Sequence, residues 1–305
     1  MRTPQLVLLG LAALLGCGAR ATARPAPAPA QSAGAVQERE LAVREAKLDN
    51  GAITVRLEIP PNPPGPKPAI LANLSEGETM ATDGVVIVTY KINWFLLKGA
   101  PPLPPPADKN TVGTWVLASP SAGRLGEHYL GQIAATANIV VPKVLDYLQT
   151  VPDVDMSRVA ITGVSTNGFI ALQAVAADQR LHAASVMAAC GDYQRFLRYS
   201  SMGMAGRPLT LDPDYAKWVD AQSVINHPRR VVHAAVLMVN RSKDPLIPIS
   251  CADATDRALR PAYAAAGGGD RYRYVRIEEQ EGHGFGPKEN AENLAWMRAW
   301  MLGKR

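Results

Sequence analysis

The stretch RVAITGVSTNGFIALQAVAAD, from Arg158 to Asp178, has the pattern of a buried strand, a sharp turn and a helix. Apolar and β-branched residues dominate the part before the turn, as in a strand that is covered on both faces. Small residues surround Ser165 at the turn, and the residues after it have helical apolar spacing. A tight turn between such a strand and helix exposes a serine hydroxyl. The stretch therefore predicts an α/β fold with a nucleophile at Ser165.

The turn itself, GVSTNG (163–168), is close to the G-x-S-x-G pattern of a nucleophile elbow. The serine of such an elbow has a strained backbone, so the residues two before and two after it must be small. Gly163 meets this requirement, whereas Asn167 stands where the second glycine is expected. Asparagine tolerates unusual backbone angles better than most residues, but it is bulkier than glycine. A glycine- and serine-rich turn without chemistry is the alternative interpretation.

A serine hydroxyl needs a base, and the base needs an orienting carboxylate. His283 lies in EEQEGHGFGP, directly after the last predicted strand, and its glycine neighbours suit a loop that projects an imidazole. Asp244 lies in VLMVNRSKDPLIPIS, just past another predicted strand, in a loop stiffened by two prolines. We expect surface or capping roles for the other histidines, His128, His182, His227 and His233. The competing candidates for the acid are Asp192, which follows a different strand, Asp220, and Asp253 and Asp256, which lie in a predicted helix.

Strands and helices alternate along most of the chain, which predicts a mostly parallel twisted sheet with helices on both faces. Segment 191–230 interrupts the alternation, and we interpret it as a short cap over one end of the sheet. The predicted strands are 52–59, 68–74, 84–90, 158–163, 184–190, 234–240 and 271–279. The predicted helices are 129–151, which Pro142 kinks or splits, 167–178, 251–266 and 289–302.

The chain order Ser165, Asp244, His283 is that of α/β hydrolases. From about residue 50 to 302 the sequence resembles an α/β-hydrolase of the dienelactone-hydrolase or prolyl-oligopeptidase-like type. The resemblance rests on ITGVSTNGF, on NRSKDPLIP as the acid loop and on EGHGF as the histidine loop. It implies the α/β-hydrolase fold and a Ser-His-Asp triad that works through an acyl-enzyme.

The same resemblance implies an oxyanion hole. One donor is expected to be the backbone N–H of Thr166, the residue after the nucleophile. The second is expected from the loop after strand 68–74, where many members of the family carry His-Gly-Gly. Here that loop contains Leu74 and Ser75 instead. We expect Ser75, or otherwise Leu74, to supply the second donor.

Substrate specificity is less clear from the sequence. Trp94 and Phe95 follow one predicted strand, and Tyr193 and Phe196 follow another, so these four can form an aromatic wall for an acyl or alcohol group. Packing in the core under the cap is the alternative. We expect a small carboxylic ester as substrate, since residues 1–50 leave no room for a propeller domain. A peptidase, an acyltransferase and a catalytically dead binding protein are the competing hypotheses.

The N-terminus resembles an export signal, with Arg2 followed by an apolar stretch from Leu6 to Leu15. Residues 1–23 predict a signal peptide that is cleaved after Ala21-Thr22-Ala23. Alternatively, 1–16 is a lipoprotein signal and Cys17 is lipidated. Residues 24–49, rich in alanine and proline at their start, predict a tether and lead-in to a domain at 50–305. We therefore expect an exported protein, either a bacterial cell-envelope lipoprotein or a periplasmic or secreted protein.

The composition excludes few classes of protein. The 305 residues carry a formal net charge of +5, but no run of Lys or Arg is present, so we expect no nucleic-acid partner. A membrane contact is expected only through the N-terminal lipid. The sequence has no H-E-x-x-H, C-x-x-C or dinucleotide loop, so no metal or organic cofactor is predicted. Cys190 and Cys251 can pair in an oxidising compartment or remain buried free thiols, and the sequence leaves both open.

Overall fold

A computed structural model describes residues 41–72, 80, 83–100 and 122–303 of the chain. Within them lies one eight-stranded sheet with the order β1-β2-β4-β3-β5-β6-β7-β8. The pairs β1–β2 and β2–β4 are antiparallel, and all later pairs are parallel. The strands are β1 Ala42–Leu48, β2 Ile53–Ile59, β3 Lys67–Ala72, β4 Val86–Ile92, β5 Val154–Val164, β6 Ala183–Met187, β7 Ala235–Lys243 and β8 Tyr272–Glu281.

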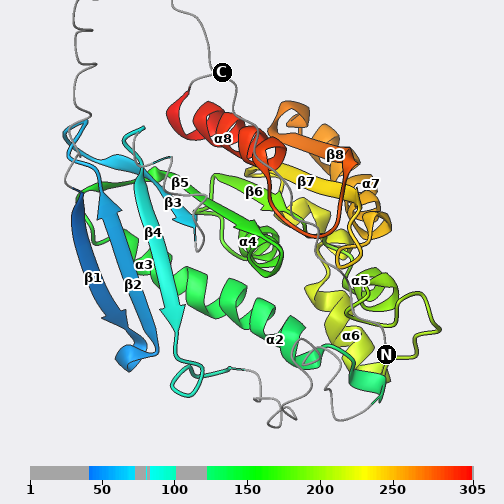
Figure 1. Cartoon of the computed structure of the whole chain (residues 1–305). Coiled ribbons are helices and arrows are strands. Elements are labelled where there is room, and N and C mark those ends of the chain that lie inside the picture. Colours follow the sequence, from blue (N-terminus) through cyan, green and yellow to red (C-terminus); the bar gives the residue numbers. More distant parts are fainter. Residues whose placement is uncertain (1–40, 73–79, 81–82, 101–121, 304–305) are drawn as a thin grey trace, which may run out of the picture. The chain divides into compact units, whose positions relative to one another are not determined.

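Helices cover both faces of this sheet. In Figure 1, α8 (red) lies on one side of the sheet and α2, α3 and α4 (green) lie on the other. The described helices are α2 Glu127–Ala135, α3 Val141–Leu148, α4 Thr166–Ala177, α5 Tyr193–Tyr199, α6 Pro213–Gln222, α7 Ile249–Ala265 and α8 Pro287–Leu302. The predicted α/β-hydrolase architecture, a mostly parallel sheet between two layers of helices, is confirmed.

The strands that lead to the site are buried along their length. Every residue of β3 and β6 is buried, and so are the last six residues of β5, Val159–Val164. Such strands read as continuous apolar runs because helices cover both of their faces. The carboxyl ends of β5, β6, β7 and β8 lie at the same edge of the sheet, since these strands are parallel. Loops that follow different strands are therefore brought together there.

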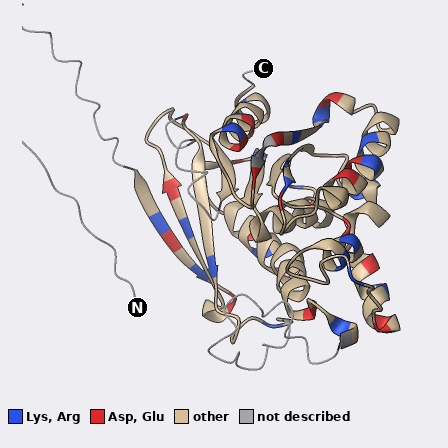
Figure 2. Ribbon diagram, turned by 45° about the vertical axis from the view of Figure 1, so that its right-hand side comes forward, with Lys and Arg blue, Asp and Glu red and all other residues tan. Residues whose placement is uncertain are grey.

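The antiparallel edge of the sheet corrects the sequence analysis. Residues 24–49 were predicted as tether and lead-in, but Ala42–Leu48 form β1, paired with β2 along its whole length. The strand mixes apolar and charged residues and is largely exposed, with charges of both signs on β1 and β2 (Figure 2). Charged side chains on an edge strand discourage pairing with another chain. The strand was missed because it has no continuous apolar run.

The long predicted helix 129–151 is interrupted. A π-helical segment, Thr136–Val140, joins α2 to α3, and Pro142 is at the start of α3. Proline lacks an N–H and its ring collides with the carbonyl four residues earlier, so it disrupts the regular hydrogen-bond pattern of an α-helix. The wider π turn accommodates the proline without ending the helix.

The predicted cap segment, 191–230, contains α5, α6 and two short 3-10 helices, Val224–Asn226 and Pro228–Arg230. It is inserted between β6 and β7. Asp192 begins α5, since its Oδ1 accepts the N–H of Arg195 at 2.9 Å. Asp192 also pairs with the Arg195 guanidinium at 3.1 Å, so this carboxylate has a structural role.

Candidate active site

Ser165 occupies the turn between β5 and α4. Its backbone angles are φ 57° and ψ −122°, which side-chain-bearing residues rarely adopt. The Ser165 N–H donates to Met187 O of β6 at 2.9 Å, and the Ser165 carbonyl accepts the Phe169 N–H at 3.0 Å. The neighbouring strand and the new helix together hold the strained residue. Strain of this kind, held by its surroundings, is typical of functional sites.

The glycines of the turn are required by close backbone contacts. A Cβ on Gly163 would lie 2.3 Å from the carbonyl carbon of Asn167, and one on Gly168 would lie 2.6 Å from Met187 O. The absence of a side chain at Gly163 is therefore what lets the first turn of α4 fold back over the end of β5. This contact also explains how Asn167 fits where a second glycine was expected.

Asp244 and His283 meet at the same edge of the sheet. Asp244 follows β7, His283 follows β8, and the two are 39 residues apart along the chain. His283 Nδ1 lies 2.8 Å from Asp244 Oδ2. The Asp244 side chain is 1% exposed and the His283 side chain 21% exposed. An ionised carboxylate can only accept, so with Asp244 in that form the neutral imidazole donates from Nδ1 and its Nε2 carries no proton.

The other oxygen of Asp244 stabilises the loop that carries it. Oδ1 accepts the N–H groups of Leu246 at 2.8 Å and of Ile247 at 3.0 Å. The end of α5 binds the same loop: Ser200 Oγ donates to Leu246 O at 2.7 Å and the Ser201 N–H donates to Pro245 O at 3.0 Å. Residues 244–248, which we call the acid loop, are therefore held from within and from the cap.

The histidine loop is fastened to α8 and β7. Glu289 Oε2 accepts the Gly286 N–H at 3.0 Å, and Glu289 Oε1 accepts from Arg241 Nε at 2.5 Å. Glu289 and Arg241 are nearly buried, with 3% and 13% of their side chains exposed. Gly282, beside His283, has φ +78°, which favours glycine. The sequence analysis missed this ion pair, whose members have no local signal that links them.

The predicted oxyanion donors differ in what the structure describes. Thr166 begins α4, so its N–H is one of the first, unpaired donors of that helix. Leu74 and Ser75 lie outside the described residues. Tyr129 of α2, which the sequence analysis did not select, shares a 3.1 Å hydrogen bond between its hydroxyl and Thr166 Oγ1. Burial raises the pKa of Tyr129 to about 12, so its phenol stays neutral at physiological pH.

The predicted aromatic wall is not formed as expected. Tyr193 and Phe196 are each 1% exposed and pack with Phe169 in the core, so they do not line an open cleft. Their helical spacing on α5 places both on its buried face. Phe95 is 84% exposed and Trp94 is partly buried against the core. Tyr193 and Phe196 are therefore core residues, as the alternative interpretation held, and the predicted substrate contact is wrong for these two.

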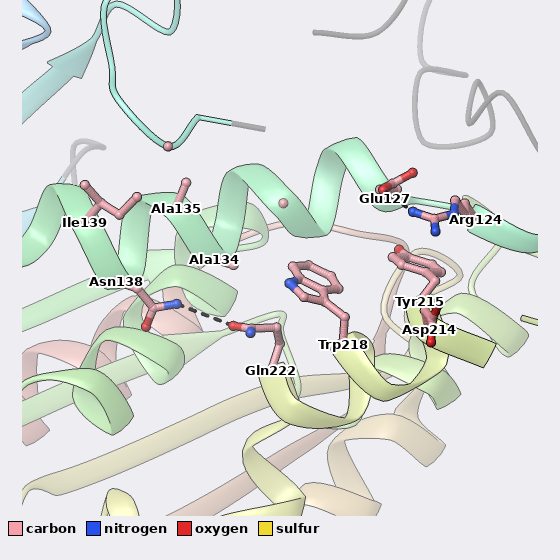
Figure 3. Close-up of a pocket in the computed structure, with 12 residues that line it drawn as sticks. Arg124, Glu127, Ala134, Ala135, Asn138, Ile139, Asp214, Tyr215, Trp218 and Gln222 are labelled. Atoms are coloured by element: carbon pink, nitrogen blue, oxygen red, sulfur yellow. Dashed lines mark hydrogen bonds and ion pairs between the residues drawn. The ribbon is translucent and has the colours of Figure 1, made fainter. Parts of the chain in front are cut away.

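A pocket of about 470 Å³ lies between α2 and α6, but it does not include the three candidate catalytic residues. Figure 3 shows Trp218 of α6 pointing toward the small residues of α2. At one end of the pocket Asn138 is hydrogen-bonded to Gln222. At the other end Arg124 is paired with Glu127. On α2 the pocket is lined by Glu127, Gly131, Ala134 and Ala135. Tyr129 lies on the opposite side of the helix from Gly131, at 100° per residue. The helix thus separates this pocket from Thr166.

Cys190 and Cys251 form a disulfide, with Cα atoms 5.7 Å apart. This resolves the alternative that the sequence left open. Among the described residues, no group of three or more His, Cys, Asp or Glu side chains is placed to hold a metal ion. No helix in the described ranges has the length and apolar character needed to cross a membrane.

Comparisons with known proteins were made on the sequence and on the fold. The model of the prolyl oligopeptidase family matches residues 141–304. No curated protein matches the chain. The fold resembles that of the Thermus thermophilus protein TT1662, with 18% identity, a TM-score of 0.59, and 86% of this chain and 98% of that chain covered.

Two enzymes of different activity have the same fold. A Mycobacterium tuberculosis puromycin-hydrolyzing peptidase has 19% identity and a TM-score of 0.56, with 86% of this chain and 39% of that chain covered. Acetyl xylan esterase 1 from Thermoanaerobacterium sp. has 13% identity and a TM-score of 0.55, with 85% and 87% covered. At these identities the likeness concerns the fold, and it does not distinguish esters from peptides.

Proposed function

The chain belongs to the prolyl oligopeptidase family of serine hydrolases, and from this premise we propose that it cleaves small carboxylic esters through Ser165, His283 and Asp244. The observation that carries the proposal is the 2.8 Å contact between His283 Nδ1 and Asp244 Oδ2. It occurs at the sheet edge where β5 ends at the strained Ser165. A hydrogen-bonded acid and histidine at the same sheet edge as such a turn are the components of a serine-hydrolase triad.

In this mechanism Asp244 keeps the imidazole in one tautomer and orientation. The free Nε2 of His283 accepts the proton from Ser165 Oγ as that oxygen attacks the carbonyl carbon of the ester. The imidazolium then returns the proton to the departing alcohol, which leaves an acyl group on Ser165. Water, activated by the same Nε2, attacks the acyl-enzyme and releases the acid and the free serine.

Negative charge on the carbonyl oxygen develops next to the first turn of α4. The Thr166 N–H donates to this oxyanion, and the partial positive charge at the start of α4 adds to the stabilisation. The removal of one oxyanion donor lowers turnover by about 10² to 10³ in well-studied hydrolases. The identity of a second donor in the 74–75 loop remains part of the proposal.

One consideration favours an ester over a peptide. An ester has a better leaving group than an amide, so it makes smaller demands on the oxyanion hole, in which the expected glycine-rich loop is replaced here. Peptide cleavage is the second candidate, and the family match favours it.

Fluorophosphonate labelling tests the proposed nucleophile. We expect the probe to modify Ser165, identified by mass spectrometry of the digested protein, and we expect no labelling in Ser165→Ala or His283→Ala. His233→Ala is the matched control, because this half-buried histidine lies after the cap and outside the site. A folded wild-type protein that does not react would contradict the assignment of Ser165 as an activated nucleophile.

A paired substrate panel tests the ester preference. Esters and amides that share the same acyl group are compared by kcat/KM, over acyl chains of increasing length. An esterase would be supported if, for every acyl group, the ratio of ester to amide kcat/KM exceeded the difference in intrinsic reactivity between the two bonds. Preferential cleavage of aminoacyl amides would assign the protein to the peptidases, and faster product formation with added alcohol would indicate acyl transfer.

We further propose that the protein is exported. The disulfide between Cys190 and Cys251 supports this, because such bonds persist mainly in oxidising compartments. Fatty-acid labelling of the full-length precursor distinguishes the two predicted N-terminal signals. Labelling that is lost in Cys17→Ala identifies a lipoprotein, and an unlabelled protein in the soluble envelope fraction identifies a cleaved signal peptide. Retention of the full-length chain in the cytoplasm would overturn export.

A further inference from the structure

The disulfide lies beside the loop that carries Asp244. Cys190 follows the end of β6, and Cys251 lies in the first turn of α7, directly after the acid loop. Both cysteines are fully buried. The bond therefore joins the start of α7, just after the acid loop, to the segment that follows β6. In the sheet, β6 lies between β7 and β5, and β5 leads to Ser165.

Hydrogen bonds strengthen the same connection. Thr255 Oγ1 accepts the Gly191 N–H at 2.7 Å and donates to Cys251 O at 2.9 Å. Thr255 is fully buried, and a Cβ on Gly191 would lie 3.2 Å from its methyl group. The start of α7 is thus bound tightly to the segment that follows β6.

The acid loop has no regular structure of its own. Pro245 and Pro248 lack N–H groups, so the loop's backbone bonds are few, and the Leu246 and Ile247 N–H groups are both used by Asp244 itself. Further hydrogen bonds run from Ser200 and Ser201 to the first part of the loop, and at its end the Cys251 N–H donates to Pro248 O at 2.8 Å. The position of the loop along the sheet edge therefore depends on what holds its far end, at the start of α7.

We propose that Cys190 and Cys251 form a positioning pair that sets the distance and direction of Asp244 relative to His283. The inference deepens the proposed function and depends on it. Neither sulfur touches substrate. The disulfide acts by fixing the end of the acid loop, so that the buried carboxylate meets His283 Nδ1 at hydrogen-bond distance. Misplacement of a catalytic group by about 1 Å can cost about a hundredfold in rate.

Replacement of both cysteines tests the proposal. In Cys190→Ala/Cys251→Ala we expect kcat for the best ester to fall about tenfold with KM changed less than twofold, because substrate binding does not involve the acid loop. In an Asp244→Asn background the same replacement should leave kcat unchanged within about twofold. Residues that act through one another show this non-additivity, whereas a general loss of stability lowers activity in both backgrounds.

Val144→Ala is the matched control for lost stability. Val144 is fully buried in α3, away from the acid loop, and its truncation should lower the melting temperature without altering kcat at a temperature where all variants are folded. Wild-type kcat in the double-cysteine variant would overturn the proposal. So would an equal fall in the wild-type and Asp244→Asn backgrounds.

Hydrogen exchange provides a second test that needs no cysteine variant. The amides of Leu246 and Ile247 should exchange faster in wild-type protein refolded with thiol than in the oxidised protein, by about tenfold or more. Equal exchange in the two forms would overturn the proposal. The oxidised wild-type protein is assayed first. If it hydrolyses no ester and does not react with fluorophosphonate, the proposed function fails, and that result is distinct from a failure of the positioning role.

Discussion

The two halves of the candidate active site are held in different ways. Ser165 is positioned by a contiguous turn, in which Gly163 lies against Asn167 and the backbone continues directly from β5 into α4. Asp244 and His283 come from separate loops and depend on α5, α7, α8 and a disulfide. The position of the nucleophile is therefore set by neighbouring residues in the chain, whereas the acid–histidine pair depends on tertiary packing.

The largest effect is expected when the acid–histidine pair is changed without altering its shape. In Asp244→Asn the side-chain amide keeps an oxygen for the N–H groups of Leu246 and Ile247 but presents N–H to His283. The imidazole then adopts the wrong tautomer, and kcat should fall about 10⁴-fold with the fold intact. Ester turnover is measured together with thermal unfolding. A loss of less than tenfold would show that Asp244 does not orient the base.

Asp192→Asn is the control for this change. Asp192 also follows a parallel strand, but its carboxylate binds Arg195 at the start of α5. We expect a small loss of stability and nearly wild-type turnover, since in the part of the chain that the structure describes this carboxylate bonds Arg195 and not His283. A loss similar to that of Asp244→Asn would identify Asp192 as a competing acid.

A substitution in the turn that carries Ser165 should cause this turn to unfold or misfold. In Gly163→Ala the new methyl group would lie 2.3 Å from the Asn167 carbonyl carbon, and backbone on both sides must shift. We expect a loss of about 1–3 kcal/mol in the free energy of unfolding, and loss of labelling at Ser165. Denaturant unfolding and fluorophosphonate reaction measure the two effects.

Gly269→Ala is the matched control for Gly163→Ala. Its Cβ would meet nothing within 4 Å, and its backbone does not need a positive φ. Unfolding free energy and labelling should stay near those of the wild type. A Gly163→Ala protein with normal stability and labelling would show that the turn can accommodate a methyl group despite the short contact distances.

The smallest effect is expected at the hydrogen bond that links α2 to the turn. Tyr129→Phe removes the hydroxyl that bonds Thr166 Oγ1, and we expect about 1 kcal/mol of lost stability and a several-fold fall in kcat. Tyr193→Phe is the control, because it removes an equally buried hydroxyl that bonds Gln173 at 2.7 Å, away from the turn. Equal effects on kcat in the two variants would show that the Tyr129 bond supports only the fold.

Much of the site was predictable because its chemistry is concentrated in short segments. The turn at Ser165, the proline-stiffened loop at Asp244 and the glycine-flanked His283 each have a local pattern. The alternation of strands and helices then predicts that all three lie at one edge of a parallel sheet. The contacts that support them were missed, since Ser200, Arg241, Glu289 and Tyr129 become neighbours of the site only after folding.

The aromatic residues show the limit of sequence patterns. Tyr193 and Phe196 follow a strand at the correct edge of the sheet, as a substrate wall would, yet α5 turns both into the core. Helical spacing alone does not say whether an apolar face packs inward or lines a cleft. Strand β1 was missed for the opposite reason, because an exposed edge strand does not need the apolar run that marks a buried one.

The sequence by itself determined the fold class, the strained turn at Ser165 and the order of the candidate triad. These follow from local backbone requirements and from the apolar pattern, which are properties of contiguous residues. Only the tertiary structure decided that Cys190 pairs with Cys251, that Arg241 pairs with Glu289, and that Tyr129 reaches Thr166. Each of these is a contact between residues distant in the chain, whose distance is set by the packing of whole helices against the sheet.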